Sequence, residues 1–372
     1  MYNLQPFKLE RYFALYEFNA PYLLSASDCE SLTLQELLAL ATPRGLELWN
    51  GLSLGYTESA GHPLLREAVA GLYNSISPEQ VLILTPEEGI FIAMQTLLSP
   101  GDRVIYVSPA YQSLYEVGRT IGCEMIPWQL ELCPEGWQVN LNRLESLLDD
   151  ETRLIVLNFP HNPTGCLPSY SEVSSIIDLA RAKNITVFSD EMYRLLEYDE
   201  QQRLPAVCDL YESGISLSGM SKSLAMPGLR IGWLASSNLD LIERWITFKD
   251  YTTICSSAPS EVLAWIGLGA RDQIFQRNIG IIQKNLEHAG EFFIRHPSFF
   301  DWHPPLAGSV AFPKWLGPGT IDELCQALVD RQGVMMVPGS LFDFPTPHFR
   351  LGLGRRNFRE ALERFEVYLG ED

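Results

Sequence analysis

The sequence predicts an α/β protein built on an open sheet covered by helices. From about residue 81 the chain alternates short apolar runs rich in β-branched residues with longer amphipathic stretches, a pattern typical of parallel strands joined by crossover helices. Several apolar runs end at Pro, Gly or Asn, which favour turns. The 372 residues also exceed one compact core of usual size, so we expect a second, smaller α+β domain.

Each expected element follows from its own pattern. Short apolar runs predict seven strands, at 81–85, 103–107, 123–127, 154–157, 185–189, 215–218 and 230–235. Amphipathic stretches between them predict helices at 88–98, 111–121, 140–149 and 170–182. The pattern then becomes helical, at 239–252, 258–269 and 271–295, and the tail adds helices at 320–331 and 357–369.

These elements suggest three segments. Residues 1–45 carry helix signals but no strand that would extend the main sheet, so we expect an N-terminal segment that packs with a C-terminal small domain, residues 286–372. Residues 46–285 form the expected large domain. Ligands of open α/β sheets bind outside the carboxyl ends of the strands, so the residues that follow the apolar runs are the ones to inspect.

Composition excludes several classes of function. A net charge of −19 and a pI near 4.7 repel polyanions, which argues against nucleic acid or an anionic membrane as partner. Seven scattered cysteines, without a Cys-x-x-Cys pair, suggest neither a disulfide framework nor a metal site. Without a signal-peptide pattern or a run of about 18 apolar residues, we expect a cytoplasmic protein.

One lysine lies in a small, polar loop between two expected strands. The segment from Ser218 to Trp233 contains Lys222 and, eight residues later, Arg230. A lysine that forms a Schiff base needs a lowered pKa, which partial burial and a neighbouring cation can supply. A solvent-facing loop lysine is the alternative.

Polar residues follow two further strands. The sequence Asn-Phe-Pro-His-Asn-Pro-Thr-Gly begins at Asn158, directly after the apolar run 154–157, and Ser-Asp-Glu-Met-Tyr-Arg begins at Ser189, after the run 185–188. By composition alone the first is a turn and the second a helix N-cap. Both lie where a ligand of the sheet is expected.

Together the three segments resemble the class I/II aminotransferases of fold type I, which depend on pyridoxal 5'-phosphate (PLP). The motifs of that family run Asn-Pro-x-Gly, Asp-x-x-Tyr and Ser-Lys with Arg eight residues on, and all occur here in order. The resemblance extends from Gly55–Gly61 to Phe349–Leu351. It implies PLP as cofactor, a mostly parallel seven-stranded sheet with flanking helices, a smaller α+β domain and a homodimer.

The resemblance also implies roles for single residues. Lys222 matches the Schiff-base lysine that later moves a proton at the substrate Cα, and Asp190 the carboxylate that faces the pyridinium nitrogen. Asn162 and Tyr193 match donors to the phenolic oxygen of the cofactor. Tyr111 matches the aromatic residue that stacks on its ring.

The same pattern supplies residues for the phosphate and the substrate. Arg230 matches the phosphate-binding guanidinium, and Tyr56 a tyrosine that reaches the phosphate from the other subunit. Arg350 matches the arginine that binds the substrate α-carboxylate, with Asn162 beside it. Ser25 lies in the segment that closes over the substrate in the family, and we expect it to contact the substrate.

The chain departs from the family at the phosphate. Many relatives have a hydroxyl residue where Gly219 stands, and Ser221 is a neighbouring substitute. The helix start that cradles the phosphate carries Glu87 and Glu88 here, so we expect both near the cofactor. Backbone N–H groups can still hold the phosphate, with the Glu87 carboxylate pointing away.

Transamination of an L-α-amino acid is the leading hypothesis for the reaction, because it is the commonest activity of the family. The alternative is a carbon–oxygen lyase or cyclase that acts on a hydroxyarginine, as in the capreomycidine-synthase branch. Glu10 and Glu17 suit a guanidinium side chain, although a solvated acidic face also explains them. A PLP-binding regulator without turnover is disfavoured by the retained Lys222, Asp190, Tyr193 and Arg350.

Overall fold

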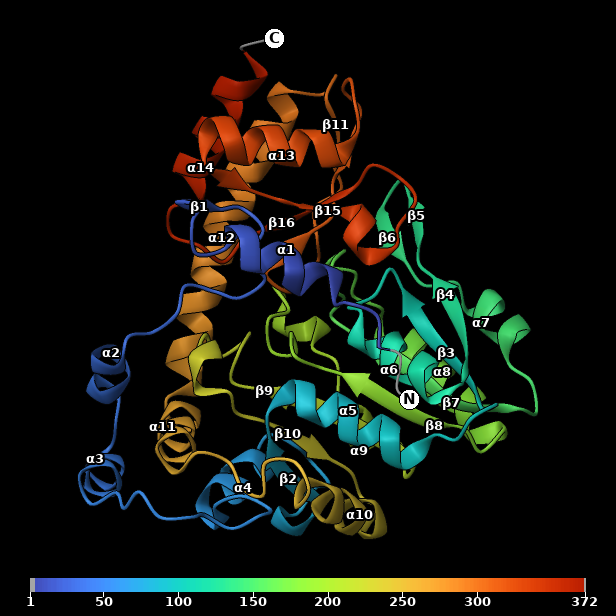
Figure 1. Ribbon diagram of the computed structural model, residues 1–372, viewed down its shortest axis with the longest axis vertical. Coiled ribbons are helices and arrows are strands. Elements are labelled where there is room, and N and C mark those ends of the chain that lie inside the picture. The colour runs from blue at the N-terminus through green and yellow to red at the C-terminus, as the bar shows by residue number, and fades with distance from the viewer. Residues whose placement is uncertain (1–3, 371–372) are drawn as a thin grey trace.

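The computed structural model describes residues 4–370 and contains one large sheet (Figure 1). Its strand order is β2-β10-β9-β8-β7-β3-β4, and β10 runs in the opposite direction to the other six. The bounds are β2 Val81–Leu84, β3 Arg103–Ser108, β4 Glu124–Gln129, β7 Thr152–Asn158, β8 Thr186–Asp190, β9 Gly214–Gly219 and β10 Gly232–Ala235. The predicted fold class is therefore confirmed, with all seven expected strands in one sheet.

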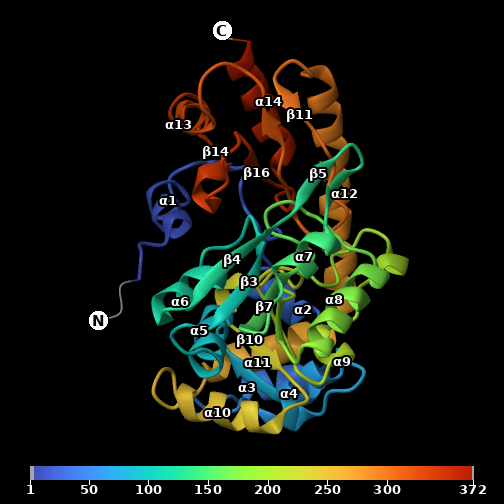
Figure 2. The ribbon, with the colours of Figure 1, turned by 90° about the vertical axis from the view of Figure 1, so that its right-hand side faces the viewer.

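Helices cover both faces of this sheet, which is why its central strands are apolar on both sides. Along β7, Leu154 and Val156 join one buried cluster while Ile155 and Leu157 join another. The first cluster includes residues of α5 (Pro86–Leu97), α6 (Ser113–Ile121) and α10 (Leu239–Lys249). The opposite face carries α8 (Tyr170–Ala182) and, further along, α4 (Pro63–Ala70) and α11 (Ala258–Gly269) (Figure 2).

The remaining helices connect and flank this core. The 25-residue α12 (Arg271–Arg295) runs from the large sheet to the C-terminal elements in both ribbon views (Figures 1 and 2). Capping boxes start α2, α8 and α13, each pairing a hydroxyl residue with a glutamate three residues later. The other bounds are α1 Lys8–Tyr16, α2 Leu34–Ala39, α3 Pro43–Asn50, α7 Leu141–Leu147, α9 Val207–Leu210, α13 Ile321–Gln332 and α14 Phe358–Leu369.

A small sheet stands apart from the large one. Its central strand β16 (Phe349–Gly352) lies between β12 (Val310–Ala311) and β15 (Val337–Pro338). The N-terminal segment pairs here too, because β1 (Tyr22–Leu23) runs parallel to β14 (Val334–Met335). The boundaries of the three predicted segments stay a prediction, and residues 1–3 and 371–372 of the outer two lie outside the described range.

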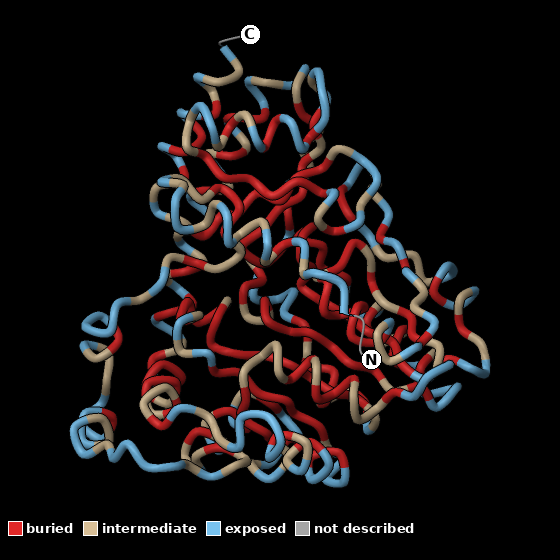
Figure 3. The backbone as a smooth tube through the Cα atoms, viewed as in Figure 1, coloured by how far each residue is buried: buried red, intermediate tan, exposed pale blue. Residues whose placement is uncertain are grey.

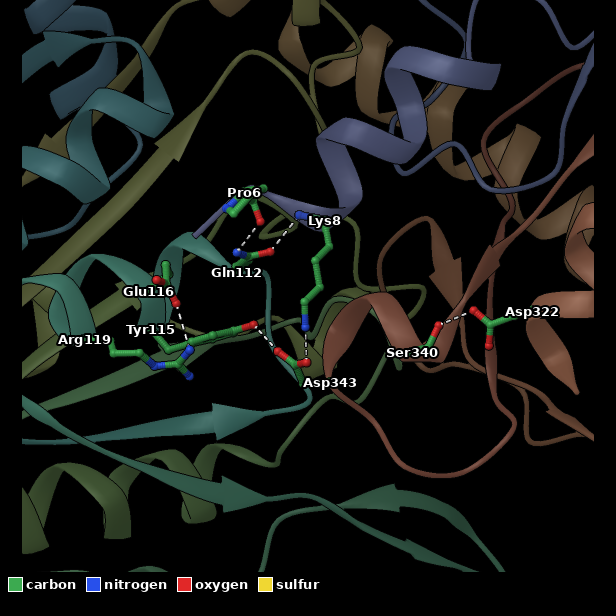
Figure 4. A network of polar contacts seen from close by, with 9 residues as sticks. All are labelled: Pro6, Lys8, Gln112, Tyr115, Glu116, Arg119, Asp322, Ser340 and Asp343. Atoms are coloured by element: carbon green, nitrogen blue, oxygen red, sulfur yellow. Dashed lines mark hydrogen bonds and ion pairs between the residues drawn. The ribbon is translucent and has the colours of Figure 1, made fainter. Parts of the chain in front are cut away.

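The N-terminal segment is fixed by side chains at the start of α6 and directly after the 3-10 turn η4 (Gly339–Phe342) (Figure 4). Gln112 accepts a hydrogen bond from the backbone N–H of Lys8 at 2.9 Å and donates one to the carbonyl of Pro6 at 3.1 Å. Asp343 pairs with the Lys8 ammonium and accepts the Tyr115 hydroxyl at 2.6 Å. These contacts hold α1 against the body of the protein.

The large sheet and the segment through α2 and α3 differ in how far their residues are buried (Figure 3). Strands β2, β7, β8, β9 and β10 are almost wholly buried, and the edge strand β4 is mostly not. The stretch through α2 and α3 is mostly exposed. Between residues 4 and 370, none of the helices combines the length and apolar character that crossing a bilayer requires.

Candidate cofactor and substrate site

A cavity of about 540 Å³ opens at the carboxyl ends of the central strands. Asn158 ends β7, Asp190 ends β8, and Lys222 follows the end of β9 by three residues. The Asn158 amide donates to the Asp190 carbonyl at 3.0 Å, and its oxygen accepts the N–H of Asn162 at 2.9 Å. This contact ties the two neighbouring strand ends together, and the N-terminal segment covers the cavity from the other side.

Lys222 points into the cavity. Its Nζ donates to the Ser27 hydroxyl at 2.8 Å. Burial lowers the pKa of Lys222, the negative charge of Asp28 opposes that shift, and the positive charge of Arg350 adds to it. A lysine in these surroundings supplies a neutral amine more readily than a surface lysine does.

Asp190 and Tyr193 share one turn after β8. Burial raises the pKa of Asp190 to about 6, while the Met192 N–H and the Lys222 charge favour its ionised form. The Tyr193 hydroxyl donates to the Ser27 carbonyl at 2.9 Å, and burial raises its pKa. Both line the cavity. A buried carboxylate of this kind suits a cationic ring nitrogen.

Arg350 is the most constrained cation of the cavity. It is 1% exposed and comes from β16. Its guanidinium donates to the Ser25 carbonyl at 3.2 and 3.0 Å and to the Asn162 side chain at 3.3 Å, all neutral acceptors. It forms no ion pair with a carboxylate of residues 4–370. A buried, unpaired guanidinium facing a cavity is a binding group for an anion.

Tyr111 and Ser25 also line the cavity. The Tyr111 ring packs on Phe7 at 4.9 Å between centroids, and its hydroxyl donates to Glu10 at 3.1 Å. Ser25 is buried and binds Arg350 through its carbonyl rather than through its hydroxyl.

Ser221, Arg230 and Glu87, which were expected at the phosphate, all line the cavity. Arg230 is exposed, and its backbone carbonyl accepts the Thr85 hydroxyl at 3.1 Å. The expectation that Glu87 points away is wrong, because its side chain turns inward toward Ser113, where burial raises its pKa to about 7.

Two expected cofactor contacts lie outside the cavity. Glu88 does not line the cavity, and its carboxylate accepts the hydroxyl of Thr253, in the loop after α10, at 2.9 Å. The prediction that it lies beside the cofactor is therefore not met. Tyr56 is 93% exposed on the surface, so within a single subunit it contacts no part of the cavity. Its role across a dimer stays a prediction.

Several residues of the site were missed by reasoning from the sequence. Ser27 binds Lys222 and Tyr193, and Phe13 and Phe342 place their rings 5.7 and 5.6 Å from the Arg350 guanidinium. Asn158 was visible as the first residue of its motif, but nothing in the sequence assigns it a partner. The contacts of Ser27 join residues almost 200 positions apart, and no local pattern encodes them.

The donor set fits PLP. The cavity offers an amine for the aldehyde, a buried carboxyl for the ring nitrogen, and a guanidinium beside a helix N-terminus for the phosphate. A mostly parallel sheet with this set at its carboxyl edge defines a PLP-dependent enzyme of fold type I. The chain belongs to the aminotransferase class I and II family, whose model matches residues 22–365.

Comparison with known proteins agrees with this assignment. The chain is 30% identical to capreomycidine synthase of Streptomyces vinaceus, over 99% of this chain and 92% of that protein. It is 29% identical to a probable N-acetyl-LL-diaminopimelate aminotransferase of Bacillus subtilis, over 84% and 81%. A solved PLP-dependent aminotransferase of Streptococcus suis superposes with a TM-score of 0.92 at 29% identity, covering 99% and 98% of the two chains. The solved PLP-dependent cyclase OrfR, at 24% identity, shares the fold with a TM-score of 0.91 and the same coverage.

Proposed function

We propose that this protein is an aminotransferase that acts at the Cα of an L-α-amino acid, with Lys222, Asp190 and Tyr193 as its catalytic residues. Family membership supports the reaction, and one observation supports the substrate. Arg350 offers a buried guanidinium without a carboxylate partner to the same cavity as the Lys222 amine. The carboxylate of an α-amino acid would neutralise the Arg350 guanidinium. Its Cα, one bond away, would then react beside the Lys222 amine.

The residues around Lys222 prepare it for two tasks. When bound, PLP withdraws the electrons released at Cα. The lowered pKa of Lys222 leaves a neutral amine that can hold the cofactor and then take or return the Cα proton. Asp190, ionised by a facing cation, would keep the ring nitrogen protonated. Tyr193 and Asn162 would donate to the phenolic oxygen, and Tyr111 would pack on the ring.

Arg350 would orient the substrate. Its two donors to Ser25 leave the planar guanidinium fixed before any ligand arrives, so little freedom is lost when a carboxylate binds. The Phe13 and Phe342 rings shield this group from water. Because Arg350 would bind only the α-carboxylate, which all α-amino acids share, the other walls of the cavity must select the substrate side chain.

A half-reaction tests the proposal. The purified protein with bound PLP is mixed with single amino acids, without any keto acid, and the products are quantified. An aminotransferase releases one equivalent of keto acid for each active site and then stops, with a changed cofactor spectrum. Continued turnover without an amino acceptor would contradict transamination. Lys222→Ala is the control, because it should bind PLP without a covalent bond.

A second function has an observation in its favour. Three carboxylates of the N-terminal segment, Glu10, Glu17 and Asp28, line the cavity, and we call them the acidic wall. Asp28 is paired with Arg355 at 3.1 Å. Burial, Asp28 and Glu10 all raise the pKa of Glu17, and a cationic side chain would relieve this repulsion. A lyase or cyclase that acts on a guanidino amino acid such as a hydroxyarginine would use such a wall. In the half-reaction it would accumulate a dehydrated or cyclic amino acid through many turnovers.

We also propose a homodimer with shared active sites. Tyr56 and Leu54 are exposed, and their segment contacts the loop after α10 through the Thr57 hydroxyl, which donates to the Ser256 carbonyl at 3.4 Å. That loop exposes Tyr251 and Ile254. A second copy that covers them would bring its own Tyr56 to the phosphate end of this cavity. All seven cysteines are free thiols, which supports residence in the reducing cytoplasm.

A further inference from the structure

The start of α5 forms the anion-binding end of the cavity. Free N–H groups at a helix N-terminus attract anions, and Arg230 is held beside this one by the bond from Thr85. However, the first residue of the helix is Pro86, which has no N–H to donate. The start of α5 therefore has one backbone N–H donor fewer to offer an anion.

This end of the cavity also lacks a hydroxyl side chain at residue 219, where the chain has Gly219. A Cβ atom at Gly219 would lie 2.9 Å from the Gly232 Cα, 3.0 Å from the Ile231 carbonyl and 3.2 Å from the Pro86 ring. A Cβ at Gly232 would lie 2.6 Å from the same ring. Pro86 thus packs directly over the backbone of β9 and β10. The backbone at Ile231 and Gly232 and, further away, the Pro86 ring together leave residue 219 no room for the side chain of a serine or threonine.

Glu87, the second residue of α5, lines the cavity directly beside this helix start. Its side chain lies inside the cavity, near the Ser113 hydroxyl of α6 and the Arg230 guanidinium, which favour the carboxylate. Glu10 of α1 and Asp190 of β8 face it with negative charge and oppose ionisation, and the Tyr111 phenol is also close. Burial is the largest cause of its raised pKa, which is about 7.

This inference rests on PLP as the cofactor. We propose that Glu87 binds the cofactor phosphate as a neutral carboxylic acid, which donates a hydrogen bond to a phosphate oxygen in place of the missing hydroxyl and N–H. An ionised Glu87 would instead repel the phosphate at close range. Phosphate binding is therefore linked to the protonation of Glu87, and a rise in pH weakens the binding of PLP.

The dissociation constant of PLP, measured by fluorescence titration of the apoprotein between pH 6 and 9, tests this linkage. Glu87→Gln keeps a donor but cannot ionise. The ratio of the wild-type constant to the Glu87→Gln constant should rise by up to about tenfold per pH unit above the pKa of Glu87. Lys222 and Asp190 titrate in both proteins, so their effects cancel in this ratio. Glu88→Gln removes the same charge outside the cavity and should behave as the wild type.

Pyridoxal, which lacks the phosphate, separates this effect from a general one. The ratio of the wild-type to the Glu87→Gln dissociation constant for pyridoxal should not change with pH. A flat ratio for PLP, or the same slope for pyridoxal, would overturn the role of Glu87 and leave the cofactor assignment intact. Failure of the wild type to bind PLP at any pH would overturn the cofactor assignment itself.

The wild-type protein provides a second test that does not depend on how the variant folds. Infrared difference spectra at pH 8 should gain the C=O band of a protonated carboxylic acid when PLP is added. Pyridoxal should not produce this band. If PLP binds without the band, Glu87 does not donate to the phosphate.

Discussion

At the scale of single residues, we predict that the Arg350 guanidinium sets the affinity for the substrate. Arg350→Lys keeps the charge but loses the flat pair of donors, so KM for the amino acid should rise by about 10- to 100-fold, the equivalent of one or two charge-assisted hydrogen bonds. Steady-state kinetics measures this. The affinity for PLP should stay unchanged, because Arg350 contacts the carboxylate site. Arg359→Lys, on an exposed helix face, is the control, and an unchanged KM in Arg350→Lys would contradict the assignment.

Glu191, beside Asp190, has a buried carboxyl with a structural role. Its Oε1 accepts the Val207 N–H and the Ser216 hydroxyl, each at 2.8 Å, and Oε2 has no partner among the described side chains. Burial raises its pKa from 4.5 to about 7. The folded protein therefore binds more protons than the unfolded chain between these values, and this group's contribution to stability declines as pH rises from about 4.5 to 7.

Glu191→Gln should remove that decline. The amide keeps both bonds to Oε1, so the free energy of unfolding of the apoprotein should match the wild type near pH 4.5 and exceed it by roughly 3 kcal/mol near pH 8. Urea unfolding at a series of pH values measures this difference. Glu145→Gln, at an exposed position, should follow the wild type, and a parallel pH profile for Glu191→Gln would show that Glu191 ionises normally.

At the scale of elements, Gln112, the residue directly before α6, holds the start of α1 over the cavity through two bonds to backbone atoms (Figure 4). Gln112→Ala should free residues 5–10, which end at Glu10 of the acidic wall. We expect faster amide hydrogen exchange in this stretch and a KM several-fold higher. Gln201→Ala, in an exposed turn, should change neither quantity. Unchanged exchange in Gln112→Ala would mean that other contacts hold α1.

The contact between α5 and strands β9 and β10 depends on matched small and rigid residues. Gly219→Ser should destabilise the protein by about 1–3 kcal/mol, because its Cβ meets the Pro86 ring and the Gly232 backbone. Pro86→Ala should recover part of this loss, so the two substitutions should be non-additive in a double-mutant cycle of urea unfolding. Strict additivity would show that Pro86 is not what excludes a side chain at 219.

At the scale of the whole molecule, shared active sites predict complementation between subunits. Lys222→Ala and Tyr56→Ala proteins should each have little activity alone. A mixture that is allowed to exchange subunits forms heterodimers in which one site has both Lys222 and the other subunit's Tyr56, so its activity should exceed the sum of the two. Light scattering of the wild type should give the mass of a dimer. A monomer, or no gain on mixing, would contradict the shared site.

Local pattern determined most of the large sheet, since the seven apolar runs match its strands to within a few residues. The differences arise at the ends, where tertiary contacts act. The run expected at 230–235 starts at Gly232 instead, because Arg230 adopts a left-handed conformation (φ 56°) after a 3-10 turn. Thr85 was expected to end a strand, and it caps α5.

The sequence by itself determined the family, the cofactor and the residues of the three motifs, because each motif directly follows a strand and its residues are close along the chain. Only the tertiary structure decided how distant segments meet. It brought Ser27 to Lys222, enclosed Arg350 with Ser25, and turned Glu87 inward and Glu88 outward. Such contacts join segments far apart in the chain, or depend on which face of a helix is covered, and neither follows from local periodicity.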